Sequence, residues 1–408
     1  MYSIQKILEN KFLNRLSSIE FVVSEKCQNS CKYCYRVKKH AASSVQYINP
    51  ENIHIYMENW KEMFNEEPSK DGIRIAELFG GDATVSYSKF KKVTEILIND
   101  YKFRYVTIPT NARLLNELHS YDIDNLFENI PAKSVIFSLS VDGNPADSQR
   151  PLSKYGKMLA YEEKINYDKI IEISKKYGYG FHPMLSFENT EIWEDAINFF
   201  FDRDVFPYLL EIRHPLYSNK QILDCVYHLA KIRIFFENKI KDKETRERLV
   251  RKLNTVSLSK TPRGLGCSAH TTATIMPNGD LPFCHRVVDK PWVMANLLTK
   301  EMDISKIVTL VSGHHHKNHP NCINCCIREV CSGQCAGASY EYWGDPWIPI
   351  NSICKYLKLK NWVFFKLFDD WNIKNQNELD YKQLDKEIKN IFSNQELKNI
   401  MDTLNKVR

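Results

Sequence analysis

The segment Cys27-Gln28-Asn29-Ser30-Cys31-Lys32-Tyr33-Cys34 places three cysteines at C-x3-C-x2-C spacing in one short stretch. Three thiolates at this spacing can hold three irons of a [4Fe–4S] cluster, although such clusters normally have four cysteine ligands. The fourth iron is then free to bind something else. A zinc site is the alternative, but zinc takes four ligands, and His40 is the only close candidate to complete the set.

An apolar run at 19–24 precedes the triplet and is typical of a β-strand. Strand-like and helix-like segments then alternate up to about residue 240. Strands are expected at 19–24, 73–79, 105–109, 134–140, 180–186 and 208–213, and helices at 50–64, 88–101, 111–118, 161–177, 190–203 and 221–241. Six βα units indicate a parallel sheet with helices outside it. The triplet therefore follows the first strand, at the end where α/β barrels place active sites.

Composition narrows the class of protein. Hydrophobic residues make up 43% and charged residues 26% of the 408 positions, as in globular domains. There is no apolar run of about 18 residues, so no membrane span is expected. Twelve cysteines without a secretory signal favour metal ligation over disulfides. The expected compartment is a reducing cytoplasm. The net charge of +6 is spread thinly, and no basic block indicates a nucleic-acid partner.

The triplet, with Tyr33 before its third cysteine, resembles the radical S-adenosylmethionine (SAM) superfamily. The resemblance implies a partial (β/α)6 TIM-type barrel. It also implies that Cys27, Cys31 and Cys34 hold a [4Fe–4S] cluster whose open iron chelates the amino and carboxylate groups of SAM.

Later strand ends carry matching motifs. Gly80-Gly81-Asp82-Ala83 stands where the family usually has Gly-Gly-Glu-Pro, and Thr110-Asn111-Ala112 resembles its Thr-Asn-Gly turn. The segment 138–143 resembles its Ser-Leu-Asp-Gly motif, and an arginine follows at 150. By resemblance the SAM contacts are Tyr33, Gly80, Gly81, Asp82, Asn111, Ser140 and Arg150. Ordinary strand-end turn chemistry is the alternative for Asn111 and Ser140.

A second set of cysteines resembles the SPASM extension, a module with two auxiliary [4Fe–4S] clusters. The pattern runs from Cys267 through the G-x4-C of Gly279 and Cys284 to C-x2-C-x5-C-x3-C at 322–335 and ends at Cys354. By resemblance one auxiliary cluster is held by four residues, Cys322, Cys325, Cys331 and Cys354. The other would be held by Cys267, Cys284 and Cys335. Zinc ribbons are the alternative for the paired cysteines.

The second auxiliary cluster lacks a fourth ligand. Some relatives supply a cysteine six residues beyond the first of the set, but Ala273 occupies that position. The open iron could bind substrate, or Cys326, His270 or His285. A histidine cluster at 314–319 is expected to be a surface loop, with adventitious metal binding as the alternative.

These patterns divide the chain into four parts. An N-terminal extension covers 1–17, the barrel 18–254, the SPASM module 255–356 and a helical C-terminal segment 357–408. Apolar stripes in the last segment are expected to be packing faces.

The resemblance implies that the reduced first cluster cleaves SAM to a 5′-deoxyadenosyl radical, which abstracts hydrogen from an unactivated carbon. Auxiliary clusters can then accept an electron from the substrate. Relatives with this module mostly modify peptides or proteins, and one branch oxidises Ser or Cys of sulfatases to formylglycine. That branch has Asp after the G-x4-C cysteine, where this chain has His285. His285 and Asp142 are the candidate catalytic residues, since a histidine titrates near neutrality.

The sequence is therefore interpreted as a peptide maturase that forms an intramolecular crosslink, with a C–C cyclophane favoured over a thioether. Sulfatase-type oxidation and a non-catalytic iron–sulfur scaffold are the alternatives. The expected partners are a precursor peptide with leader and core, and a reductase or flavodoxin as electron donor. Only 26 residues precede Cys27, too few for a leader-binding winged helix. The leader would bind the barrel, the SPASM module, the C-terminal helices or a separate protein.

Overall fold

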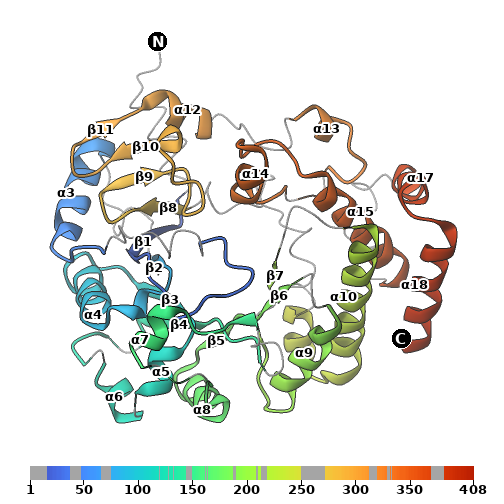
Figure 1. Ribbon diagram of the computed structural model, residues 1–408, viewed down its shortest axis with the longest axis horizontal. Coiled ribbons are helices and arrows are strands. Elements are labelled where there is room, and N and C mark those ends of the chain that lie inside the picture. The colour runs from blue at the N-terminus through green and yellow to red at the C-terminus, as the bar shows by residue number, and fades with distance from the viewer. Residues whose placement is uncertain are drawn as a thin grey trace. The chain divides into compact units, whose positions relative to one another are not determined.

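A computed structural model defines the fold (Figure 1). It describes residues 16–36, 47–65, 75–118, 120–126, 128–131, 133–143, 149–160, 162, 164–186, 190–207, 210–212, 218–249, 272–311, 319–328, 331, 333–368 and 381–408. The chain forms two compact units. The first comprises 1–143, 147–183 and 268–313, and the second comprises 144–146, 184–267 and 314–408. Within the described ranges, no helix is both long and apolar enough to cross a bilayer.

A six-stranded parallel sheet organises the first unit, in the order β5-β4-β3-β2-β1-β8. Its strands are β1 (Ser18–Ser24), β2 (Ile75–Gly80), β3 (Tyr105–Thr110), β4 (Val135–Leu139), β5 (Gly180–Phe181) and β8 (Thr272–Ile275). The ends of each of the first four strands agree with those of a predicted strand to within two residues. The carboxyl ends of these strands share one edge, as the alternation of strands and helices predicts.

The two faces of this sheet differ. Residues such as Phe21, Leu78, Ile108 and Phe137 are fully buried on one face. Figure 1 shows helices along one side of the strands. They are α3 (Asn52–Phe64), α4 (Tyr87–Glu95) with its π-helical extension (Ile96–Asp100), α5 (Arg113–Glu117), α6 (Ser120–Asp124) and α8 (Tyr167–Tyr177). The opposite face is less completely buried and contains polar side chains. Groups that could take part in binding or catalysis therefore lie on that face.

The predicted strand at 180–186 is wrong as a single element. It divides into β5 and β6 (Met184–Ser186), with His182 and Pro183 between them. Proline has no backbone N–H and cannot donate to a strand ladder. β6 pairs in parallel with β7 (Leu210–Ile212) in a separate two-stranded sheet of the second unit.

The sixth strand of the main sheet comes from later in the chain than predicted. β8 pairs with β1, with Ser18 opposite Thr272 and Glu20 opposite Thr274. A turn at Asn278-Gly279 connects β8 to β9 (Asp280–Pro282), and Gly279 has a φ of 82°. β9 continues into β10 (Val293–Asn296) and β11 (Glu301–Met302), followed by α12 (Ile304–Val311). Tyr56 and Asn59 of α3 donate hydrogen bonds to the carbonyls of Pro277 and Leu297, which attach this segment to α3.

Apart from the β6–β7 pair, the described part of the second unit is mainly helical. Its helices are α9 (Trp193–Phe201), α10 (Asn219–Lys239), α13 (Pro320–Ile323), α14 (Ala336–Trp343), α15 (Asn351–Leu367), α17 (Tyr381–Ile391) and α18 (Asn394–Val407). The predicted C-terminal stripes are confirmed as packing faces, since Leu357, Leu384 and Ile388 are buried in one apolar core. Cys225, the cysteine outside both motifs, lies in the same core.

Candidate functional site

The loop with the three cysteines lies at the carboxyl end of β1 and is braced by the segment 149–156. Ser30 and Lys32 donate backbone hydrogen bonds to the carbonyls of Pro151 and Gln149, at 2.8 and 3.0 Å. In return, Ser153 donates its backbone N–H to Gln28 O and its hydroxyl to Cys27 O, at 2.8 and 2.9 Å. The loop is therefore held by another segment's backbone along most of its length.

Ser153 also begins the short helix α7 (Lys154–Met158), whose Gly156 faces the same loop. The Gly156 N–H donates to the Ser153 hydroxyl at 2.9 Å. A Cβ at Gly156 would lie 2.2 Å from the carbonyl oxygen of Gln28, far inside contact distance. Glycine is therefore required for α7 to reach the cysteine loop.

Gly80 and Gly81 brace the loop from the other side. Gly80 has a φ of 140°, and a Cβ there would lie 1.9 Å from Ser24 O. A Cβ at Gly81 would lie 2.3 Å from Lys26 O. Gly81 donates its N–H to Ser24 O at 2.8 Å, and Asp82 donates to Lys26 O at 2.9 Å. In this structure, the two glycines allow close backbone approach to the residues just before Cys27.

The thiols of this loop suit an iron–sulfur cluster with three protein ligands. The Asn29 N–H and the Asn111 side-chain amide both donate toward Cys27 Sγ, at 3.4 and 3.6 Å. Burial raises the pKa of the Cys27 and Cys31 thiols, that of Cys31 to about 11. Metal binding would therefore release protons. Among the described residues, no group of three His, Cys, Asp or Glu side chains is arranged to hold one metal ion. An iron–sulfur cluster does not need that arrangement, because each of its thiolates binds a separate iron.

Asp82 is a buried acceptor that joins the ends of two strands. Its carboxylate accepts from the Thr84 N–H and hydroxyl, at 2.9 and 2.6 Å. It also accepts from the Thr110 hydroxyl at 3.0 Å and from the Asn111 N–H at 2.7 Å. Burial raises the pKa of Asp82, although these hydrogen bonds oppose the shift. The side chain predicted as a SAM contact thus orients the Asn111 turn.

That turn shows how the chain departs from the family pattern. Ala112 stands where the resembled motif has glycine, and its φ of 63° and ψ of 5° are left-handed. This conformation costs a non-glycine residue roughly 1–2 kcal/mol. The Asn111 side chain accepts from the Arg113 N–H and donates to Gln28 Oε1, at 3.0 Å each. The strained turn directs Asn111 toward the cysteine loop.

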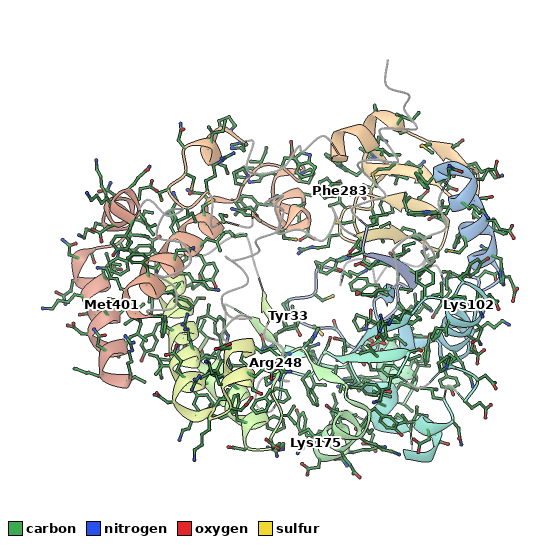
Figure 2. The ribbon with its side chains drawn as sticks, turned by 180° about the vertical axis from the view of Figure 1, so that it is seen from behind. Tyr33, Lys102, Lys175, Arg248, Phe283 and Met401 are labelled. Carbon is green, nitrogen blue, oxygen red and sulfur yellow. The ribbon has the colours of Figure 1, made fainter. Side chains whose placement is uncertain are left out.

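Arg150 and Asp142 form a buried ion pair. Arg150 donates through Nε to one carboxylate oxygen at 2.6 Å and through Nη2 to the other at 2.7 Å. Tyr33, labelled in Figure 2, donates its hydroxyl to the same carboxylate at 3.2 Å. The Tyr33 ring lies 5.2 Å from the guanidinium carbon. Asp142 was predicted as a catalytic residue, and this geometry gives it the task of orienting Arg150. Ser140 follows β4 directly, and its N–H donates to Thr110 O at 2.7 Å.

A row of polar side chains crosses the less covered face of the sheet. Glu20 of β1 is in register with Glu77 of β2 and Thr274 of β8, and Glu77 is in register with Thr107 of β3. Residues in register project from the same face of a sheet. The Thr274 hydroxyl donates to Glu20 at 2.6 Å, and the Thr107 hydroxyl donates to Glu77 at 3.5 Å. This row was not predicted from the sequence, because partners on different strands do not form a local motif.

His285 joins this row. Its Nδ1 lies 2.9 Å from Glu20 Oε2, and its ring packs on Phe79 with centroids 4.4 Å apart. Burial raises the pKa of Glu20, but the His285 interaction and the Thr274 hydrogen bond leave it below the ordinary value. The predicted base thus has a defined carboxylate partner.

The four cysteines expected to hold one auxiliary cluster belong to the second unit and lie close together. Burial raises the pKa of Cys322 to about 11, and neighbouring Cys331 and Cys325 add to the shift. Burial and the other three thiols raise the pKa of Cys354 to about 12. Gly333 donates its N–H to Cys331 Sγ at 3.3 Å. Mutual proximity of four thiols is what a fully ligated cluster needs.

Two residues that the sequence analysis missed complete this four-thiol site. The Gln334 side-chain amide donates to Cys354 Sγ at 3.0 Å. Lys358 follows Cys354 by one helical turn of α15 and pairs with Glu387 at 2.6 Å. Its charge acts on the thiols of Cys322, Cys325 and Cys354 and favours their ionised forms. Lys358 could have been predicted from the sequence, because residues four positions apart on a helix lie next to each other.

The ligands expected for the other auxiliary cluster are only partly described. Cys267 and His270 lie outside the described residues, as does most of the histidine cluster. Cys284 is buried in the first unit, and Cys335 precedes α14 in the second. Cys326 shares a hydrogen bond with Cys325, which lowers the pKa of Cys325 and raises that of Cys326. This ligand set stays a prediction.

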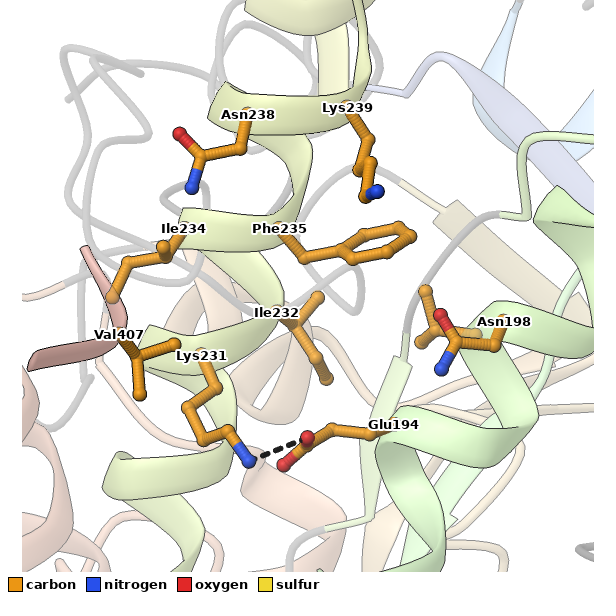
Figure 3. Close-up of a pocket in the computed structure, with 10 residues that line it drawn as sticks. Glu194, Asn198, Lys231, Ile232, Ile234, Phe235, Asn238, Lys239 and Val407 are labelled. Atoms are coloured by element: carbon orange, nitrogen blue, oxygen red, sulfur yellow. Dashed lines mark ion pairs between the residues drawn. The ribbon is translucent and has the colours of Figure 1, made fainter. Parts of the chain in front are cut away.

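A pocket of about 180 Å³ lies within the second unit, between α9, α10 and the end of α18 (Figure 3). Ile197, Ile232 and Phe235 form apolar walls, and Lys231 pairs with Glu194 at 2.6 Å. None of the residues predicted from the sequence to act in catalysis or cofactor binding lines this pocket. This pocket is therefore separate from the residues predicted to carry the chemistry.

Gly81→Ala and Gly156→Ala should each displace the cysteine loop, because the added Cβ would overlap Lys26 O or Gln28 O. After anaerobic reconstitution, each variant should contain about four fewer irons per chain than wild type. Gly180→Ala is the matched control, since a Cβ there meets nothing within 4 Å. Full iron content in the first two variants would contradict the bracing.

Lys358→Met should lower the midpoint potential of the cluster at the four-thiol site, because the variant removes a cation near its thiolates. Glu387→Gln, which removes the opposing carboxylate, should raise it, and Lys358→Arg should keep the wild-type value. Redox titration followed by electron paramagnetic resonance measures the shift. Equal shifts in the Met and Arg variants would mean that packing, and not charge, is responsible.

Glu77→Gln should remove a pH dependence of stability. Burial, reinforced by Glu20, raises the pKa of Glu77 from 4.5 to about 8. The folded state binds the Glu77 proton more tightly than the unfolded state does. The stability that this proton contributes to folding is therefore complete below pH 4.5 and is lost as pH rises through 8. Relative to the variant, wild type should lose up to about 1.4 kcal/mol of unfolding free energy per pH unit in that window. Glu58→Gln, on an exposed position of α3, is the control for urea unfolding. Identical pH profiles for wild type and Glu77→Gln would refute the shift.

The chain is similar to known proteins in fold over most of its length and in sequence over a short segment. No protein-family model matches the chain. The probable GTP 3′,8-cyclase of Methanocaldococcus jannaschii is 26% identical over 113 residues, which are 27% of this chain and 34% of that protein. The chain thus spans about a third of the length of the curated relative it matches.

Solved structures match over most of the chain. Polyhistidine-tagged anSMEcpe with bound AdoMet (S-adenosylmethionine) has a TM-score of 0.60 at 16% identity, over 91% of this chain and 98% of that one. Streptococcus suis SuiB bound to S-adenosylmethionine has a TM-score of 0.54 at 14% identity, over 83% and 77%. The predicted fold class is confirmed: this chain has the fold of these S-adenosylmethionine-bound proteins.

Proposed function

We propose that this chain is a radical SAM enzyme that modifies a peptide and forms an intramolecular crosslink in it. The observation that carries the proposal is the three-thiol loop at the carboxyl end of β1, braced on both sides and supplied with N–H donors to sulfur. Cys27, Cys31 and Cys34 would hold the cluster. With SAM bound, that cluster supplies radical chemistry that removes hydrogen from carbon.

The surrounding residues would bind and orient SAM. Tyr33 lies within the cysteine loop, and Arg150 and the Gly80-Gly81 backbone lie beside it. A guanidinium matches a carboxylate through two hydrogen bonds. Arg150 already holds the Asp142 carboxylate in that manner. Asn111 would also contact the bound SAM, and Asp82 accepts a hydrogen bond from the Asn111 N–H and so fixes its position.

A peptide substrate is supported by the similar structures. SuiB is described bound to the precursor peptide SuiA, with a TM-score of 0.50 and 16% identity over 84% of this chain and 77% of that one. anSMEcpe is described with AdoMet and the Kp18Cys peptide, with a TM-score of 0.56 and 15% identity over 95% and 99%. The substrate of this chain would be a precursor peptide with leader and core, and auxiliary clusters would accept one electron from it. The finer proposal is a C–C cyclophane.

Oxidation of a Ser or Cys to an aldehyde, as in sulfatase maturation, is the second candidate. It stays a candidate because the similarity to anSMEcpe, described with bound AdoMet and with a peptide, covers almost the whole of each chain. His285 is evidence against sulfatase-type oxidation, because the sulfatase branch has Asp at this position. His285 could still accept a proton, oriented by Glu20.

Mass spectrometry of a peptide encoded beside the gene, co-expressed anaerobically, tests the proposal. A crosslink should remove two hydrogens per site and block fragmentation inside a short segment. Cys27→Ala should abolish the product and leave the four-thiol site loaded, whereas Cys225→Ala, in the core, is the control for cysteine loss. An aldehyde that traps hydrazine would favour the second candidate. Reduced wild-type protein that never cleaves SAM would leave the scaffold alternative.

A further inference from the structure

The outer side of the cysteine-loop brace carries an exposed surface that nothing above uses. Met158 and Leu159, at the end of α7, are 73% and 41% exposed. Lys154 and Lys157 are also exposed on this helix. Lys154, Lys157 and Met158 stand at i, i+3 and i+4 and therefore share one side of the helix. The result is a small apolar centre with cations beside it.

Two tyrosines extend this surface to the residue before Cys27. Lys26 Nζ lies 4.7 Å from the Tyr155 ring and 5.4 Å from the Tyr47 ring. Lys89 Nζ lies 4.8 Å from the Tyr47 ring. The two tyrosine hydroxyls are 3.3 Å apart. We use the term α7 face for the set Lys26, Lys89, Lys154, Lys157, Met158 and Leu159.

The α7 face is strongly basic. Four of its six residues are lysines and none is acidic. The whole chain, in contrast, is nearly balanced, with 56 basic and 50 acidic residues. A local excess of one sign attracts partners of the other sign and speeds their association.

The α7 face is also close to the cysteine loop. Ser153, one residue before α7, donates its hydroxyl to Cys27 O at 2.9 Å. Gly156, inside α7, packs directly on Gln28. A protein seated on Met158 and Leu159 would therefore be separated from the cysteine loop by a single turn of helix.

We propose that the α7 face is the docking surface for an acidic one-electron carrier protein of the flavodoxin class. This proposal rests on the proposed function, in which the cluster at Cys27, Cys31 and Cys34 must be reduced. The reduced carrier gives up one electron and the cluster gains it, with no bond made or broken in either protein. Small interfaces with a few apolar contacts and complementary charge are typical of such transient redox pairs. An exposed methionine also adapts to varied partner surfaces.

Binding of purified flavodoxin to the reconstituted enzyme, measured by calorimetry, tests the proposal. Lys154→Glu/Lys157→Glu should weaken binding at least about tenfold at low salt. Wild-type affinity should itself fall between about 0.05 M and about 0.3 M salt. Met158→Ser should weaken binding with an unchanged salt dependence. Lys398→Glu/Lys406→Glu, a matched reversal at exposed positions of α18, should bind like wild type.

Reduction assays separate this proposal from the proposed function. Dithionite, a small chemical reductant, should drive SAM cleavage equally in wild type and Lys154→Glu/Lys157→Glu, whereas flavodoxin-driven cluster reduction should slow in the variant. Failure of dithionite with wild type would refute the proposed function and leave the binding result standing. Unchanged flavodoxin affinity in the variant would overturn the docking surface. The same holds if the variant loses only affinity for the precursor peptide.

Discussion

The close backbone contact around Cys27 is the constraint on which the candidate site depends. Gly80-Gly81 reaches the carbonyls of Ser24 and Lys26, and α7 with Ser153 reaches those of Cys27 and Gln28. A loop with three metal ligands would otherwise have considerable conformational entropy to lose on binding. Because the two braces satisfy its carbonyls, the loop is ordered by the protein, and the cluster has less ordering to provide.

The same braces connect the loop to the polar groups behind it. Asp82 directly follows Gly81 and gathers donors from Thr84, Thr110 and Asn111. A buried carboxylate with several donors has a single favourable arrangement, because each lost hydrogen bond leaves a buried group unsatisfied. The position of Asn111 beside Cys27 thus follows from a network that begins in the glycine turn.

Local patterns in the sequence were sufficient for much of this architecture. The cysteine triplet after a strand, the glycine pair and the four-thiol spacing are all contained in short segments, and the first four strands have clear apolar runs. The sixth strand of the sheet was assigned wrongly, because β8 has only four residues and pairs with a strand about 250 positions earlier. Glu20, Glu77 and Gln334 were missed for a related reason. Their partners come from other strands or turns, and nothing in the neighbouring sequence marks them.

Charged residues near the two thiol sites reinforce or oppose the effect of burial on the thiols. At the first site burial is the main cause that raises the pKa of Cys27 and Cys31; Arg150 opposes the shift at Cys31, and the charge of Asp82 adds to the shift at Cys27. At the four-thiol site Lys358 acts in the opposite sense on Cys322, Cys325 and Cys354. Charges, hydrogen bonds to sulfur and solvent exposure set cluster potentials, and hydrogen bonds to charged groups are about twice as strong as those between neutral ones. Each site therefore has a cation, Arg150 or Lys358, that offsets part of the cost of burying its thiolates.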